Sequence, residues 1–459
     1  MAFVEVAANT LDDAYSIDNS LRLEDGDSPY LELAHGADGN TKTFTYSWWF
    51  KQGNITINRN FFGHSSVDDQ ILIKNDDRMQ FSVNNSVDAR FVTTQVFRDV
   101  SAWYHCVIAV DTTQSTDTNR VKIYINGTQI TAFDTAEYPD QNYDFTGFNT
   151  NTNNQYIGRE RGGNYFDGYM SEIYFIDGQA KAPTDFGEFN DNGVWIPKDA
   201  KDDLTFGNNG YYLEFKQTGT SQNSSGIGAD TSGNDEHFAV SNLASTDVTT
   251  DTPTNNFCTV NPIGGSGSSA HWTFSEGNTQ IQQNANGVWR ATGSTMAVSK
   301  GKWYWEVEFD AGDMREIFVG VHDSEVSLEG TNRWVNGSTL FYNHNGGEIR
   351  QDGTDTTNDY GVLTAGDILG VALNMDDDQI TLYDNGSAIV TNFSLSSSIT
   401  EAMPTFMADY NDVVYKVNFG NPPFSISSGN SDANGYGNFE YAVPTNYYAL
   451  CTKNLAEFG

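Results

Sequence analysis

Phe44-Thr-Tyr-Ser-Trp-Trp-Phe50 is the stretch that decides the fold class of this chain. The aromatic residues at positions 44, 46, 48 and 50 alternate with Thr45, Ser47 and Trp49, so an extended chain places these four rings on one face. A repeat of two residues indicates a β-strand that buries one face in a core. The chain around this stretch is therefore expected to form a β-sheet.

The same alternation recurs in both halves of the chain. Apolar side chains are spaced by two within residues 121–125, 303–309, 380–382 and 413–419. Asn126-Gly127 and Asn385-Gly386 follow two of these stretches, and this pair favours the type I′ turn of a β-hairpin because both positions need positive φ. No long amphipathic helix is predicted, only a helical turn near Thr184–Asn190. We therefore predict an all-β fold of antiparallel strands.

Two strand-rich blocks are separated by a change in composition. A chain of 459 residues exceeds what one core usually organises. Between about residues 186 and 267 the strand pattern gives way to loops, and Gly264-Gly-Ser-Gly-Ser-Ser269 has the composition of a flexible hinge. We predict two antiparallel β-sandwich (jelly-roll) modules at 15–185 and 270–425, joined by an irregular connector at 186–269, with a tail at 426–459 that packs back.

The charge of the chain excludes some classes of partner. It carries 61 acidic and 24 basic residues, for a net charge of −37. Such a field repels phosphate backbones and anionic lipid, so we expect neither nucleic acid nor a membrane as partner. No stretch reaches the roughly 20 apolar residues of a membrane-spanning helix. The first residues lack the basic region of a secretory signal, so we expect a soluble protein made in the cytoplasm.

The three cysteines do not suggest a disulfide framework or a zinc site. Cys106, Cys258 and Cys451 are far apart in the sequence and odd in number, and none belongs to a Cys-x-x-Cys pair. Cys106 lies in an apolar run, which is typical of a small core residue.

The first block resembles the laminin-G-like, or concanavalin-A-like, jelly-roll family. The pieces that carry the resemblance occur in the family's order: Leu21-Arg-Leu-Glu-Asp-Gly-Asp-Ser-Pro-Tyr-Leu31, Phe44-Thr-Tyr-Ser-Trp-Trp-Phe50, Trp103-Tyr-His-Cys-Val-Ile-Ala-Val-Asp111, Val121-Lys-Ile-Tyr-Ile-Asn-Gly127 and Phe166-Asp-Gly-Tyr-Met-Ser-Glu-Ile-Tyr174. The resemblance implies a concanavalin-A-like sandwich across some 160 residues.

The second block resembles the SPRY family, which has a related sandwich fold. The matching pieces are Ser299-Lys-Gly-Lys-Trp-Tyr-Trp-Glu-Val-Glu308, Ile317-Phe-Val-Gly-Val321, Ala365-Gly-Asp-Ile-Leu-Gly-Val-Ala-Leu373, Gln379-Ile-Thr-Leu-Tyr-Asp-Asn-Gly386 and Val417-Asn-Phe-Gly420.

Three further stretches resemble tail-fibre-like and other virion proteins of bacteriophages, many of them from marine sources. They are Ala14-Tyr-Ser-Ile-Asp-Asn-Ser-Leu-Arg-Leu23, Asp251-Thr-Pro-Thr-Asn-Asn-Phe-Cys-Thr-Val-Asn-Pro262 and Tyr448-Ala-Leu-Cys-Thr-Lys-Asn-Leu455. This resemblance implies a virion structural protein, in a tail fibre, another appendage or a capsid decoration, with host recognition through a cell-surface glycan or receptor. It further implies other virion proteins as partners and a homo-oligomer, by analogy a trimer, with residues 1–14 as a docking segment. A phage protein needs no signal peptide, because lysis releases it.

We predict that the protein is not an enzyme. Hydrolytic members of the concanavalin-A-like family carry Glu-x-Asp-x-Glu on one strand, and two carboxylates about 5 Å apart act as acid and nucleophile. The nearest stretch here, Glu306-Val-Glu-Phe-Asp310, has the wrong order, and the resemblance assigns Glu306 to the SPRY strand signature.

No cofactor is predicted, although two acidic places could hold Ca²⁺, a hard cation that takes several oxygen ligands. Asp376-Asp-Asp378 is one, and Asp167 with the acidic loop Asp25–Asp27 is the other. A polar turn and a solvated loop explain the two places more simply.

Two loops hold the candidate ligand-binding residues, because aromatic and Arg side chains on loops mark binding surfaces. The residues are Tyr143, Arg159, Arg161 and Tyr165 in the first block, and Arg333, Trp334, Tyr342 and His344 in the second. The same side chains could instead cover core edges or contact neighbouring subunits. The alternatives to a glycan-binding virion protein are a purely structural capsid or tail cementing protein and a glycan hydrolase.

Overall fold

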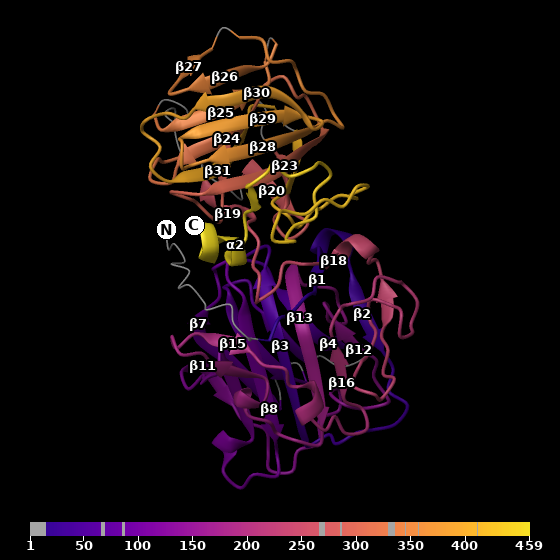
Figure 1. Cartoon of the computed structure of the whole chain (residues 1–459). Helices are drawn as coiled ribbons and strands as arrows, with labels where there is room; N and C mark the ends of the chain where they lie inside the picture. The colour runs from indigo at the N-terminus through magenta and orange to yellow at the C-terminus, as the bar shows by residue number, and fades with distance from the viewer. Residues whose placement is uncertain are drawn as a thin grey trace. The chain divides into compact units, whose positions relative to one another are not determined.

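A computed structural model of the chain describes residues 15–65, 69–84, 88–265, 271–284, 287–328, 336–344, 346–356, 358–410 and 412–459. The predicted all-β fold of antiparallel sandwiches is confirmed (Figure 1). The described residues form two compact units, 15–254 and 255–459, which we call the first and second modules. Arg333, Trp334 and the proposed docking segment 1–14 lie outside the described residues.

The first module is a sandwich of two sheets. The β3 sheet has the order β10 (Thr128–Gln129), β9 (Val121–Ile125), β8 (Tyr104–Asp111), β3 (Thr43–Gln52), β13 (Gly168–Asp177), β1 (Ser20–Leu23) and β18 (Val248–Thr249), with β16 (Tyr211–Leu213) paired to β13. The β5 sheet has the order β11 (Phe133–Glu137), β7 (Ala89–Val96), β6 (Arg78–Val83), β5 (Gln70–Ile73), β4 (Arg59–His64), β12 (Gln155–Ile157), β2 (Tyr30–Leu33) and β17 (Ala239–Ser241).

The second module is also a sandwich. One sheet has the order β19 (Val260–Gly265), β22 (Arg290–Ser294), β31 (Ala402–Ala408), β24 (Ile317–Asp323), β25 (Ser338–Tyr342), β26 (Glu348–Gln351) and β27 (Thr354–Asp355). The other has the order β20 (Trp272–Ser275), β21 (Gln280–Gln283), β32 (Val414–Asn418), β23 (Lys302–Ala311), β28 (Ile368–Asn374), β29 (Gln379–Asp384) and β30 (Ser387–Ser394), with β33 (Tyr448–Ala449) paired to β23.

The remaining elements are short. A hairpin joins β14 (Gly187–Phe189) to β15 (Trp195–Pro197). The helical elements are η1 (Asp25–Asp27), η2 (Asp117–Asn119), η3 (Pro183–Asp185), η4 (Lys201–Asp203), η5 (Ser245–Asp247) and α2 (Thr452–Phe458). Within the described part of the chain, no helix has the length and apolar character that crossing a membrane requires.

The core of the first module begins with β3. The aromatic side chains predicted to share a face are fully buried between the two sheets, with Phe44, Tyr46, Trp48 and Phe50 at 0% exposure. The other face of β3 is covered as well. There His105 stacks between Trp49 and Trp195, and its ring nitrogens contact Ser47 Oγ and Trp195 Nε1 at 2.9 and 3.0 Å. Burial lowers the pKa of His105 to about 3, so this histidine is a neutral packing residue.

Both predicted Asn-Gly hairpins are confirmed. Asn126 and Gly127 have φ of 47° and 75°, and Asn385 and Gly386 have φ of 46° and 79°. These left-handed values match the twist of the strands that the turns connect.

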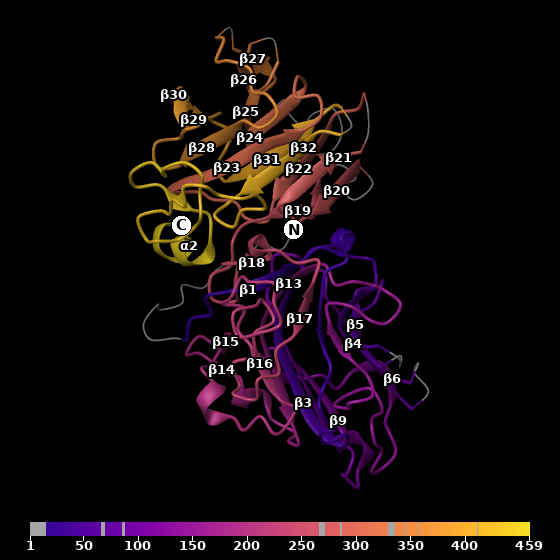
Figure 2. The same cartoon turned by 90° about the vertical axis from the view of Figure 1, so that its right-hand side faces the viewer.

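The segment from residue 186 onward contributes to both modules. Its strands β16, β17 and β18 pair with β13, β2 and β1 of the first module, and β19 pairs with β22 of the second (Figure 2). Residues 426–459 pack on β23, where Phe439 meets the Tyr304 ring edge-on.

Candidate functional site

The outer face of the β5 sheet carries a row of polar side chains. Because strand residues alternate between faces, Ile71 and Ile73 enter the core while Gln70, Leu72 and Lys74 face away from it. Leu72 pairs with Asn60 on β4 and with Gln80 on β6, so these three side chains share one row on the outer face. The row offers amide groups beside one apolar side chain.

A loop at residues 158–166 crosses this face above β4. Gly63 makes the crossing possible, because a Cβ atom there would lie only 2.6 Å from Cα of Glu160. The loop closes on itself, since Glu160 accepts hydrogen bonds from the Gly162 N–H at 2.6 Å and from Asn164 Nδ2 at 3.0 Å. Phe166 is fully buried in the core and anchors the end of the loop.

The loop and the strands enclose a pocket of about 310 Å³. Its lining residues are Asn58, Gln70, Leu72, Lys74, Gln80, Glu160 and Asn164. The two charged members already have partners within the protein, because Lys74 Nζ lies 2.8 Å from Asp76 and Glu160 bonds within its loop. The pocket is therefore mainly a set of amide donors and acceptors.

Asn60 lies in the same row and has an unused acceptor. Its Nδ2 donates to the Asn164 carbonyl at 3.2 Å, while its Oδ1 is buried and has no hydrogen-bond partner among the described residues. A buried carbonyl oxygen without a donor is rare in folded proteins, because losing its hydration costs about 1–3 kcal/mol. Because Asn60 is fully buried and is not among the residues that line the pocket, this oxygen belongs to the wall behind the pocket and not to its surface.

Arg159 lies in the same loop beside an aromatic cluster. Its guanidinium carbon is 4.7, 4.8 and 5.3 Å from the ring centres of Tyr30, Tyr156 and Tyr165. Nε and Nη2 donate to the carbonyls of Glu160 and Arg161, both at 3.0 Å. The guanidinium is thereby fixed in position, half-buried, on the outer side of β2 and β12.

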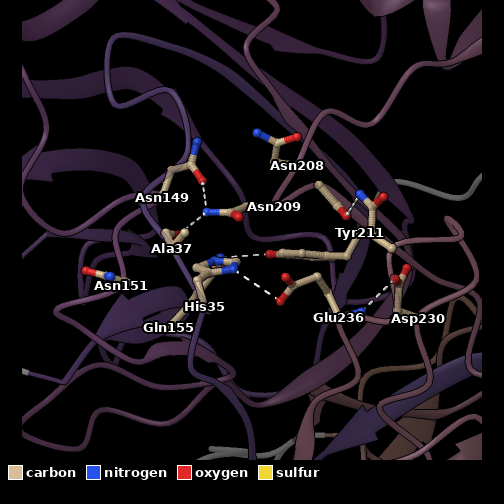
Figure 3. Close-up of polar contacts among 12 residues, drawn as sticks. His35, Ala37, Asn149, Asn151, Gln155, Asn208, Asn209, Tyr211, Asp230 and Glu236 are labelled. Carbon is tan, nitrogen blue, oxygen red and sulfur yellow. Dashed lines mark hydrogen bonds and ion pairs between the residues drawn. The ribbon is translucent and has the colours of Figure 1, made fainter.

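The inner side of β12 is held by a buried polar network. Gln155 Nε2 donates to the hydroxyls of Tyr46 and Tyr211 at 2.6 and 2.7 Å, and its Oε1 lies 3.3 Å from His35 Nε2. Figure 3 shows His35 directed toward Glu236, at 3.3 Å. These contacts fix the strand whose outward residue is Tyr156.

A second part of the network joins loops that are far apart in sequence. Asn209 Nδ2 donates to the Ala37 carbonyl and to Asn149 Oδ1, each at 2.9 Å (Figure 3). Asp230 accepts from the Tyr212 N–H at 2.9 Å. These bonds hold residues 207–236 firmly against the sandwich that carries the pocket.

Two parts of the chain match models of known families. Residues 25–183 match the family model of the concanavalin A-like lectin/glucanases superfamily, and residues 302–422 match that of the SPRY domain. The chain thus carries a concanavalin A-like module and a SPRY domain. No curated protein matches the chain.

Several solved structures are similar to the SPRY part. The SPRY domain of human HERC1 is 16% identical with a TM-score of 0.30, and the match covers 34% of this chain and 96% of that domain. The TRIM65 PSpry domain is 11% identical with a TM-score of 0.29, and the match covers 35% and 92%.

The concanavalin A-like module contains three of the predicted ligand residues in one loop. Arg159, Arg161 and Tyr165 all belong to the 158–166 loop, and Arg161 is exposed. Tyr143 lies apart from them, where its hydroxyl donates to Asp88 at 2.8 Å and its ring packs edge-on against Phe145.

The SPRY domain holds the other two described candidates. Tyr342 stacks on Phe318 at 4.2 Å and on His344 at 5.0 Å. Glu316 joins the pair, because it accepts from the Tyr342 hydroxyl at 2.5 Å and lies 2.9 Å from His344 Nδ1. These two residues form a packed, hydrogen-bonded cluster.

The lining residues of the pocket were missed by the sequence reasoning. Gln70 and Gln80 do stand out as polar positions between buried ones, but that pattern is the same for any solvated strand face. Asn58, Glu160 and Asn164 carry no sequence signal that separates them from ordinary turn residues.

A group of three carboxylates in the concanavalin A-like module fits a hard cation. Glu24, Asp25 and Asp167 place oxygen atoms within 4.8 Å of one another. Gly53 lets Asp167 lie close, because a Cβ there would be 1.8 Å from Asp167 Oδ1. Burial, with the Asp25 charge second, raises the pKa of Asp167 to about 8. The donor set suits Ca²⁺, which takes carboxylate oxygens and would neutralise this group.

The two other acidic stretches have structural roles. Asp376 lies in a turn, where its Oδ1 accepts from the Gly301 N–H at 2.8 Å. Glu306 is fully buried and accepts from the backbone N–H groups of Glu440 and Tyr441 at 2.9 and 2.8 Å. Burial raises the pKa of Glu306 above its usual range. Its carboxylate fastens the C-terminal tail to β23.

Proposed function

We propose that this chain is a structural protein of a bacteriophage particle whose concanavalin A-like module binds carbohydrate of the host cell surface without cleaving it. It would form part of a fibre, another appendage or a decoration, associate with other virion proteins and assemble as a trimer. The sequence resemblance to virion proteins supports the assignment to a bacteriophage particle. The two domain types, which are typically non-catalytic binding domains, support the mode of action.

The single observation that carries the binding function is the pocket above β5. Gln70, Gln80 and Asn164 line it beside an apolar floor at Leu72. Gln80 Nε2 donates to Ser82 Oγ at 3.1 Å and Asn164 Nδ2 to Glu160 at 3.0 Å, whereas the Gln70 amide makes no side-chain hydrogen bond within the described residues. Sugars present many hydroxyl groups, each a donor and an acceptor, which such amides match.

The lining of the pocket favours binding over hydrolysis. Glycoside cleavage needs two carboxyl groups about 5 Å apart, or about 6.5–9.5 Å apart in inverting enzymes. Glu160 is the single carboxylate among the residues that line the pocket, and it is occupied by hydrogen bonds within its own loop.

Glycan arrays probed with the purified full-length chain test the proposal. The wild type is expected to bind a defined set of oligosaccharides, and Gln70→Ala to weaken that binding about tenfold through the loss of hydrogen bonds. Gln129→Ala is the matched control, because Gln129 is an exposed strand glutamine on the other sheet of the same module.

Two outcomes would contradict the proposal. If Gln70→Ala and Gln129→Ala bind glycans as tightly as the wild type does, the pocket is not the binding site. If no glycan binds and the outer face of the β5 sheet is covered by neighbouring subunits in the intact particle, the protein is a cementing protein.

A further inference from the structure

Arg159 has no acidic partner in a chain that is rich in acids. Acidic residues outnumber basic ones by 61 to 24, and six arginines of the described residues pair with a carboxylate, as Arg59 does with Asp77 at 3.0 Å and Arg350 with Asp355. No ion pair joins Arg159 to a carboxylate of the described residues; its guanidinium contacts two carbonyls and three rings. The Arg159 guanidinium therefore has no direct ion-pair partner within the described residues.

The guanidinium has one nitrogen that the protein does not use. Nε and Nη2 donate to backbone carbonyls, whereas Nη1 makes no hydrogen bond within the described residues. A guanidinium that is already fixed loses little side-chain entropy when it binds an anion, and its planar fork suits carboxylate and sulfate groups. Such contacts are stronger than neutral hydrogen bonds.

The position of Arg159 connects it with the pocket. The next residue, Glu160, lines the pocket, and the loop backbone between them lies against Gly63 on the outer face of the β5 sheet. The pocket over β5 and β6 and the Arg159 cluster over β2 and β12 therefore lie on the two sides of one loop. A ligand longer than one sugar unit can contact both.

We propose that the concanavalin A-like module selects an acidic carbohydrate, with one sugar in the pocket and a carboxylate or sulfate group of a neighbouring sugar on Arg159. This inference rests on the proposed function and names its ligand class. The net charge of −37 repels an anionic polymer at a distance, and at physiological salt this repulsion is screened beyond about 8 Å. Selection of an anion by this chain thus depends on a local cation such as Arg159.

Binding of three soluble probes to the full-length chain by calorimetry tests the inference. The probes are an oligouronate, the same oligosaccharide with its carboxyl groups reduced to alcohols, and a sulfated galactan oligosaccharide. The wild type is expected to bind at least one anionic probe about tenfold more tightly than the reduced one, because only the anionic probe can form a charge-assisted hydrogen bond with Arg159. Preference for one anionic probe identifies whether carboxylate or sulfate is the group recognised.

Arg159→Gln and Lys122→Gln form a matched pair, since each removes one positive charge from the module and Lys122 lies on β9 of the other sheet, away from the pocket. Arg159→Gln is expected to lower affinity for the anionic probe to that of the reduced probe, with binding of the reduced probe unchanged. Lys122→Gln is expected to leave both affinities within about twofold, as for a charge remote from the ligand. Circular dichroism and thermal melting establish that each variant is folded.

The results separate this inference from the proposed function. Equal wild-type affinity for the reduced and anionic probes would overturn the acidic-ligand inference and leave carbohydrate binding standing, and this comparison needs no variant. Equal losses in Arg159→Gln and Lys122→Gln would also overturn it, because the effect would be one of general charge. The absence of binding to all three probes and to every glycan of the array would overturn both.

Discussion

Glu172 is a buried carboxylate with an unusual environment. It lies in a bulge of β13 with φ of 49°, and the hydroxyls of Tyr174 and Tyr212 donate to it at 2.8 and 2.6 Å. Tyr15 adds a weaker contact at 3.3 Å. Burial raises the pKa of Glu172 to about 7, above its ordinary value of 4.5, despite these donors.

The raised pKa of Glu172 determines the direction in which the free energy of unfolding changes with pH. Between pH 4.5 and 7 the folded protein holds a proton on Glu172 that the unfolded chain has lost, so stability falls as pH rises through this window. The total effect is about 3 kcal/mol, from about 1.4 kcal/mol per pKa unit. Glu172→Gln should remove it, measured by urea unfolding of the concanavalin A-like module at pH 5 and pH 8. Glu188→Gln, at an exposed position, is the control, and an unchanged pH slope in Glu172→Gln would contradict the assignment.

The Glu24, Asp25 and Asp167 group gives a prediction about metal. Ca²⁺ that binds only the folded state raises the melting temperature by mass action. We expect 1 mM Ca²⁺ to raise the melting temperature of the wild-type module by a few degrees relative to chelator, and expect no such rise in Asp167→Asn. Asp191→Asn, an exposed acid elsewhere in the module, should respond as the wild type does. A rise that persists in Asp167→Asn would place the ion elsewhere.

At the scale of elements, the 158–166 loop can cross β4 only because Gly63 has no side chain. Gly63→Ala would place a methyl group 2.6 Å from Glu160 Cα and 2.7 Å from the Arg159 carbonyl, so the loop must move. We expect about 1–3 kcal/mol of destabilisation, as for other overpacked sites, together with loss of glycan binding. Chemical denaturation and the glycan array measure the two effects. Gly36→Ala, where a Cβ meets nothing within 4 Å, should change neither.

The C-terminal tail depends on one carboxylate of β23. Removing the Glu306 side chain leaves the N–H groups of Glu440 and Tyr441 without their acceptor. Glu306→Ala is expected to destabilise the SPRY domain by about 2–4 kcal/mol, since several hydrogen bonds to a charged group are lost. Thermal unfolding and proteolysis of residues 426–459 report the effect. Glu325→Ala, at an exposed position, serves as control, and equal stability of the two variants would refute the anchoring role.

Sequence pattern predicted the elements that are long or marked by special turns. The alternation in β3 identified its buried aromatic rings, and the Asn-Gly pairs identified two hairpins, because these signals are local. Strands β17 and β18 have three and two residues and exist through pairing with β2 and β1. Their signal is non-local, and a single sequence does not contain it in readable form.

The whole molecule shows why the site was only partly predictable. The pocket takes residues from β5, β6 and a loop some 80 to 90 positions later in the chain, and only the fold brings them together. The aromatic and Arg residues of the loop were visible in the sequence, whereas the amides that line the pocket resemble those of any turn or solvated strand. The acidic composition predicts that nucleic acid and anionic lipid are not partners, and this stays a prediction. Arg159, which has no ion pair within the described residues, is the local feature from which an anionic ligand is inferred.

A crystal structure of the full-length chain with its tightest-binding oligosaccharide tests the central claim most directly. The account predicts a sugar ring in the pocket above β5, in contact with Gln70 and Gln80. It also predicts an anionic group of the adjoining sugar on Arg159. A sugar bound on the SPRY domain or at another face of the concanavalin A-like module, with the pocket empty, would contradict it.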